Sequence, residues 1–157
     1  MQKIKRGDEA KRDVPLDYKQ VLIAQYPHLA NRQFSNLIIM FSSHHKELVN
    51  QQKIMTQRRW HANTENRFIA AWKANALVRV WGGQGHSTTL GWMSLIFVGR
   101  RRIRDMTSVD CFLEGCGGMS QNDFYTTYFA KPALKNKKNP PSIDEEMTLL
   151  VFHFFPL

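Results

Sequence analysis

The sequence has few cysteines, few acidic residues and no long apolar run. Among its 157 residues, Cys111 and Cys116 are the two cysteines, which are too few for a disulfide framework. We expect free thiols in a reducing compartment, because a zinc site would need two further ligands and none is suitably spaced nearby. No apolar run approaches the roughly 20 residues that a membrane helix needs. We therefore expect no membrane partner.

The N-terminal residues carry charge where a secretory signal would carry an apolar core. Lys3, Lys5 and Arg6 are followed by Asp8 and Glu9, and the two acids also argue against a transit peptide. The expected location is therefore the nucleus or the cytoplasm.

Basic residues outnumber acidic ones by 22 to 13, which gives a net charge of +9. A charge of this size favours contact with nucleic-acid phosphates, so the expected partner is RNA, DNA or an RNA–DNA hybrid. Two clusters carry this expectation. One combines cations with an aromatic ring suited to stacking on a base, and the other packs four arginines into five residues. Each could instead be a solvated helix end or turn. The predicted nucleic-acid-binding residues are Arg58, Arg59, Trp60, Arg100, Arg101, Arg102 and Arg104.

Local signals predict an α+β chain whose basic N-terminal half is helical and is followed by β-hairpins and a helix. Within that half we expect helices over 16–26, from Asn31 to about Met55, and over 65–81. The expected organisation is a disordered basic tail at 1–14, a helical segment at 15–82, a Gly/Arg-rich connector with one apolar segment at 83–104, and a final segment at 105–157.

Two short motifs leave alternatives open. His44 and His45 are adjacent, and neighbouring residues on a helix diverge by about 100°, so ordinary histidines are favoured over a shared metal ion. The segment Gly82–Thr89 has glycines that could expose backbone N–H groups to a phosphate, but His86 stands where a phosphate-binding loop has lysine. A helix stop and linker is the alternative there.

The segment Asp110-Cys-Phe-Leu-Glu-Gly-Cys-Gly-Gly118 resembles the opening strand of the ribonuclease H domain of retroelement reverse transcriptases. That family typically has Asp-Ala-Ser-Leu-Glu-Gly-Trp-Gly-Gly there, and six of the nine positions match. The aromatic run Phe124–Phe129 is similar to the hairpin that follows in the family. Ile143–Met147 resembles the start of the next helix, with Glu146 as the matching acid. The resemblance covers about residues 105–155.

This resemblance implies a metal-dependent nuclease that cleaves the RNA strand of an RNA–DNA hybrid. Carboxylates would hold Mg²⁺ ions that activate water and stabilise the leaving oxygen. Asp110 would be the strand ligand and Glu146 the helix ligand, and these two residues are the predicted catalytic and metal-binding pair.

Few residues follow Glu146, so the family's later acids have no counterpart. We therefore expect a truncated, inactive domain that retains nucleic-acid binding, with another protein subunit as a candidate for completing the fold. The alternative is a non-enzymatic nucleic-acid-binding or ribosome-associated scaffold that binds phosphates through its arginines. Binding by such a scaffold should survive loss of Asp110 and weaken with salt.

Overall fold

The computed structural model describes residues 16–82 and 88–157, so the predicted N-terminal tail and the middle of the Gly-rich segment lie outside the described residues. Five strands form one mixed sheet in the order β1-β3-β4-β5-β2. β1 pairs with β3 in parallel and the other neighbours are antiparallel. The strands are β1 Phe34–Met40, β2 Met55–Arg58, β3 Leu77–Gly82, β4 Thr88–Arg102 and β5 Glu146–Pro156.

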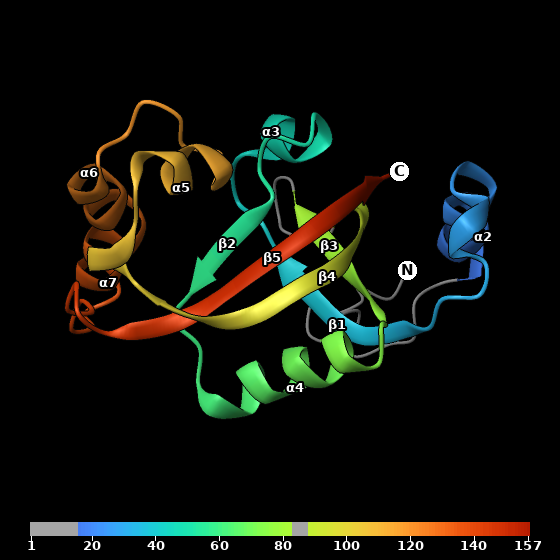
Figure 1. Ribbon diagram of the computed structural model, residues 1–157, viewed down its shortest axis with the longest axis horizontal. Helices are drawn as coiled ribbons and strands as arrows, with labels where there is room; N and C mark the ends of the chain where they lie inside the picture. The colour runs from blue at the N-terminus through green and yellow to red at the C-terminus, as the bar shows by residue number, and fades with distance from the viewer. Residues whose placement is uncertain (1–15, 83–87) are drawn as a thin grey trace, which may run out of the picture.

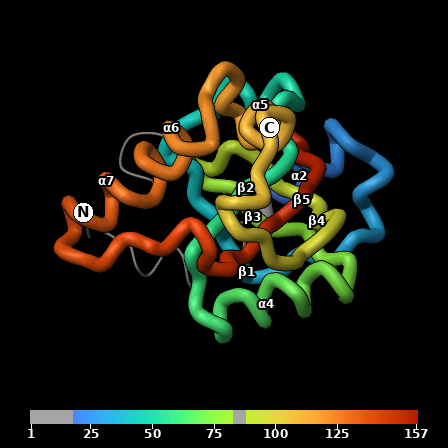
Figure 2. The backbone as a smooth tube through the Cα atoms, turned by 60° about the vertical axis from the view of Figure 1, so that its left-hand side comes forward, coloured from blue at the N-terminus to red at the C-terminus, as the bar shows by residue number. Residues whose placement is uncertain are grey.

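Helices surround the sheet at three places. In Figures 1 and 2, α4 runs below the sheet and α5 and α6 lie on the opposite side. Figure 1 shows α2 at the right, at the end of the molecule away from α5, α6 and α7. The helical elements are α2 Leu16–Gln25, η1 Pro27–Leu29, α3 His45–Val49, α4 Ala62–Lys73, η2 Ile103–Asp105, α5 Ser108–Leu113, α6 Gln121–Tyr125, η3 Thr126–Ala130 and α7 Lys131–Lys135.

The prediction of a helical N-terminal half is wrong, because β1, β2 and β3 all lie within it. The expected helix from Asn31 is instead β1, the short α3 and β2. The helix expected over 65–81 exists as α4 but ends early, because Asn75 adopts a φ of 55°. The amides of Asn75 and Ala76 then bond back to Trp72 and Ala71, which is a Schellman stop.

The segment that resembled a ribonuclease H strand is the helix α5. Thr107 and Asp110 form a capping box, in which each side chain accepts a hydrogen bond from the other residue's backbone amide. Gly115, at a φ of 88°, ends the helix in a second Schellman arrangement, with the Cys116 amide bonded to the Cys111 carbonyl. Gly115 of this segment therefore belongs to a helix stop.

The predicted aromatic hairpin at 124–129 is also helical. Ser120 caps α6 by accepting a hydrogen bond from the Asp123 amide, and α6, η3 and α7 follow one another without a break. Because Pro132 has no N–H to donate and its ring crowds the preceding turn, the π-helical step just before it is a natural accommodation. Phe124 and Phe129 face a second core that packs against Met147 of β5.

The main core lies between the sheet and α4, and β5 contributes buried residues from the middle of the sheet. Leu150, Phe152 and Phe154 are each at most 1% exposed. The C-terminal residues from Glu146 were expected to start a helix, but their aromatic and β-branched side chains suit a central strand. The apolar C-terminal segment is thus buried within the chain itself.

We predict that Phe152→Ala lowers the free energy of unfolding by about 3–5 kcal/mol, because it opens a cavity in the core. Ile96→Ala on β4 serves as the control, since Ile96 is 58% exposed and its loss should cost less than about 0.5 kcal/mol. Urea unfolding monitored by circular dichroism measures both. Equal losses would contradict the assigned core.

Candidate functional site

A cavity of about 420 Å³ lies between β2 with its flanking segments and the helices α6 to α7. Its volume is within the range typical of small-molecule sites. Buried side chains form its floor, whereas Arg59 and Lys138 are exposed at its mouth. The lining includes the aromatic residues Phe41, Trp60, Phe124, Tyr128 and Phe129, and the polar residues His44, Lys53, Thr56, Gln57, Arg58 and Glu114.

Two of the lining residues are a fully buried pair of opposite charge. Lys53 and Glu114 are 4% and 2% exposed, and the Lys53 Nζ lies 3.7 Å from Oε2 of Glu114. Lys53 also donates a hydrogen bond to the backbone carbonyl of Glu114. Burial lowers the pKa of Lys53, while the Glu114 charge opposes that shift. Burial likewise raises the pKa of Glu114 against the pull of Lys53 and Arg101.

Arg101 completes this charge cluster from β4. Its Nη2 donates to Oε1 of Glu114 at 2.7 Å and to the side-chain oxygen of Gln57, also at 2.7 Å. The Gln57 amide donates in turn to the Arg101 carbonyl. The cluster of Lys53, Glu114, Arg101 and Gln57 therefore joins β2, β4 and the end of α5 beneath the cavity.

The stop of α5 brings Glu114 to this position. Glu114 directly follows α5 as its C-cap residue, and Gly115 turns the chain so that it passes close to Lys53, just before β2. A Cβ at Gly115 would lie 3.3 Å from Cβ of Lys53 and from the ring of His44. Glycine supplies both the left-handed backbone and the close approach.

A second group of polar side chains lines one side of the cavity. The Nε2 atom of His44 lies 2.9 Å from the Tyr128 hydroxyl and 3.5 Å from Sγ of Cys116. Burial lowers the pKa of His44 and raises the pKa of Cys116, which favours a neutral imidazole and a thiol at neutral pH. His44, Tyr128 and Cys116 are therefore uncharged groups that can form hydrogen bonds with a ligand in the cavity.

Of the predicted nucleic-acid-binding residues, the structure brings Arg58, Arg59 and Trp60 together in the cavity wall. Arg58 lies over the Phe41 ring at 4.9 Å. Arg59 makes two hydrogen bonds to the Glu145 carboxylate, at 2.8 and 3.0 Å. The remaining predicted arginines lie along or just after β4 and all make ion pairs: Arg100 with Glu65, Arg101 with Glu114, Arg102 with Asp105 and Arg104 with Asp144.

The predicted metal pair, Asp110 and Glu146, lies in elements other than those expected. Asp110 is part of the α5 capping box and lies 3.7 Å from Arg101, and Glu146 begins β5 rather than a helix. Within residues 16–82 and 88–157, no group of three or more histidine, cysteine or acidic side chains is arranged to hold a metal ion.

Sequence reasoning missed Lys53, Glu114 and the His44–Tyr128 contact. The capping box at Thr107–Asp110 and the glycine that follows Glu114 were readable signals for a helix that ends there. A lone lysine just before a short strand carries no comparable signal, since its burial depends on packing between distant segments.

No family model and no curated protein matches this sequence. The solved structures that share the fold include the following two. One is a protein from Enterococcus faecalis V583 described by the family model DUF984, with 14% identity, a TM-score of 0.63 and coverage of 91% of each chain. The other is an ASCH domain from Lactobacillus crispatus JV V101, with 12% identity, a TM-score of 0.60 and coverage of 94% of this chain and 99% of that one.

These likenesses overturn the ribonuclease H resemblance. The fold is the mixed five-stranded sheet shared with the DUF984 protein and the ASCH domain. The six matching positions lie on a capped helix and its stop, so the inferred retroelement and reverse-transcriptase origin is also wrong. Among the described residues, no helix is long and apolar enough to cross a bilayer.

We predict that Glu114→Ala lowers the free energy of unfolding by about 3–5 kcal/mol, because it leaves Lys53 and Arg101 without their shared carboxylate. The control is Glu145→Ala, which removes the partner of the exposed Arg59 and should cost less than about 1 kcal/mol. Urea unfolding at neutral pH distinguishes them. A loss as small as the control's would show that the buried charges are not coupled.

Proposed function

We propose that this chain is an RNA-binding domain that takes one base of a single strand into the cavity described above. The observation that carries the proposal is the composition of the cavity wall, which combines aromatic rings with a buried amine and an arginine. Bases of unpaired RNA are recognised by stacking on such rings and by hydrogen bonds to their exposed edges. The structural likeness to an ASCH domain is compatible with an RNA ligand.

The distribution of charge supports a ligand whose base lies inside the cavity and whose phosphate lies at the mouth. Arg59 and Lys138 lie exposed at the mouth, where a phosphate would remain solvated. Thr56 is buried at the floor, and its hydroxyl oxygen accepts from Arg58 Nε at 3.2 Å while its O–H is a donor suited to a base. The chain's net charge of +9 adds a longer-range attraction that weakens with salt.

We predict that Arg58→Gln weakens binding of fluorescein-labelled hexauridylate by about tenfold, as loss of one charge-assisted contact in a cavity should. The matched controls Arg102→Gln and Arg104→Gln remove the same charge from exposed ion pairs outside the cavity lining. Their affinity should stay within about twofold of the unmodified chain. Fluorescence anisotropy at several salt concentrations, with melting temperatures as a folding check, provides the comparison.

A larger loss in the two control variants would place RNA on the outer arginines and contradict the proposal. Tighter binding of the matching deoxyribose hexamer would instead identify DNA as the preferred strand. The same anisotropy titrations measure the affinities of the control variants and of the deoxyribose hexamer.

The buried amine favours a second function in the same cavity, hydrolysis of an acyl group on the bound ligand. Burial lowers the pKa of Lys53, and a lysine in its neutral form can act as a general base. Thr56 is a lining residue of the same cavity. In this mechanism Lys53 takes the Thr56 proton while the oxygen attacks the acyl carbon, the leaving group departs with that proton, and water then releases the acid.

We predict that the chain hydrolyses 4-nitrophenyl acetate at a rate that rises with pH as Lys53 loses its proton. Lys53→Met should remove this rate, whereas Lys138→Met, at the cavity mouth, should retain it. Release of 4-nitrophenolate measured across the pH range tests this. Equal rates in both variants would exclude Lys53 as the base.

A further inference from the structure

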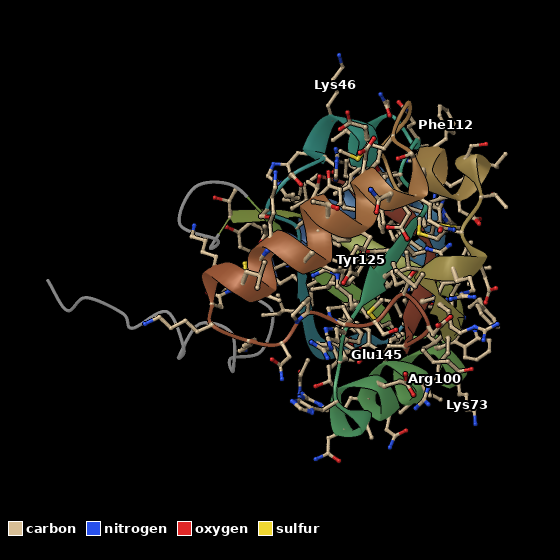
Figure 3. The ribbon with its side chains drawn as sticks, turned by 90° about the vertical axis from the view of Figure 1, so that its left-hand side faces the viewer. Lys46, Lys73, Arg100, Phe112, Tyr125 and Glu145 are labelled. Atoms are coloured by element: carbon tan, nitrogen blue, oxygen red, sulfur yellow. The ribbon has the colours of Figure 1, made fainter. Side chains whose placement is uncertain are left out.

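A second cavity, of about 590 Å³, lies beside the first at the end of the sheet nearest the start of α4. It is bounded by His61 and Glu65 from the start of α4, by Arg100 of β4 and by the first residues of β5. Figure 3 shows Glu145 and Arg100 near each other between α7 and α4, with Tyr125 on the helix above.

The two cavities share a wall. Arg59, Trp60 and Lys138 line both of them. The Trp60 ring packs against Phe68, with centroids 4.4 Å apart, and this contact fixes its position between the cavities. The shared wall therefore presents one aromatic ring, Lys138 and an arginine paired with Glu145. A ring beside a cation is the composition expected where a strand passes from one base site to the next.

The second cavity has the chemistry of a hydrogen-bonding site. Glu65 is 7% exposed and makes a two-nitrogen contact with Arg100, with N–O distances from 2.8 to 3.2 Å. Thr148 donates a hydrogen bond to the same carboxylate. The acids Glu145 and Glu146 offset the cations, so a second phosphate is a poor occupant, whereas carboxylates can accept hydrogen bonds from ribose hydroxyls and from base amino groups.

We propose that the second cavity holds the nucleotide next to the one in the first cavity, so that the ligand is a single RNA strand read over two consecutive positions. The phosphate that links the two nucleotides lies at the shared wall against Lys138, since Arg59 is paired with Glu145. Trp60 separates the two bases. This inference rests on the proposed RNA binding and extends it from a single base to a dinucleotide step.

Chain-length dependence tests the inference. Calorimetric titration should show uridylyl-(3′→5′)-uridine binding at least about tenfold more tightly than uridine 5′-monophosphate, the gain expected from one more stacked nucleotide. Arg100→Gln should reduce the dinucleotide affinity about fivefold and leave the monophosphate unchanged. Arg102→Gln, a matched arginine of the same strand that lines neither cavity, should change neither affinity by more than about twofold.

Photocrosslinking locates the two nucleotides without any substitution in the protein. Dinucleotides with 4-thiouridine at either the first or the second position should give different crosslinked peptides, one from the first cavity (residues 40–44 or 124–136) and one from the second (residues 61–65 or 145–148). Equal affinity for both ligands, with both crosslinks in the first cavity, would overturn the inference and leave single-base binding intact. Absence of binding by either ligand would overturn both proposals.

Discussion

The cavity depends on one buried interaction, the carboxylate of Glu114 between Lys53 and Arg101. Removing two cations and an acid from water is costly unless each finds partners, and here the three side chains satisfy one another with help from Gln57. The arrangement joins the end of α5 to β2 and β4. Without it, the helical segment from α5 to α7 would lose its charged attachment to the sheet and the cavity its floor.

A buried ion cluster of this kind is a weak source of stability compared with a well-packed apolar core. The main core, with Phe152 and its neighbours, already holds the sheet against α4. We therefore attribute the buried lysine at the cavity wall to the proposed ligand rather than to folding. Perturbed ionisable groups that face a cleft are typical of functional sites.

The sequence allowed part of this account to be predicted. Basic charge, the pairing of Arg58 and Arg59 with Trp60, and the existence of α4 were readable because they depend on local pattern. The strands β1 and β2 were not, because the apolar residues from Phe34 to Met55 fit a helical stripe as well as two short strands. The glycines after Glu114 suggested a family motif, whereas the physical role of Gly115 is to stop a helix.

The site itself required the fold, because its components come from distant segments. Lys53, Arg101 and Glu114 meet only when β4 lies beside β5 and β5 beside β2. The same packing separates the arginines that the sequence groups together, since Arg101 turns inward to Glu114 while Arg100 and Arg102 are exposed. Arginines that are adjacent in the sequence therefore do not all lie on the same surface of the fold.

The most direct test of the account is to map a bound ribonucleotide by nuclear magnetic resonance. Titrating ¹⁵N-labelled protein with uridine 5′-monophosphate should shift the backbone amides of residues 40–44, 53–60 and 114–116, which surround the cavity. Shifts confined to residues 100–105, with the cavity amides unchanged, would contradict the account and place the ligand on the outer arginines.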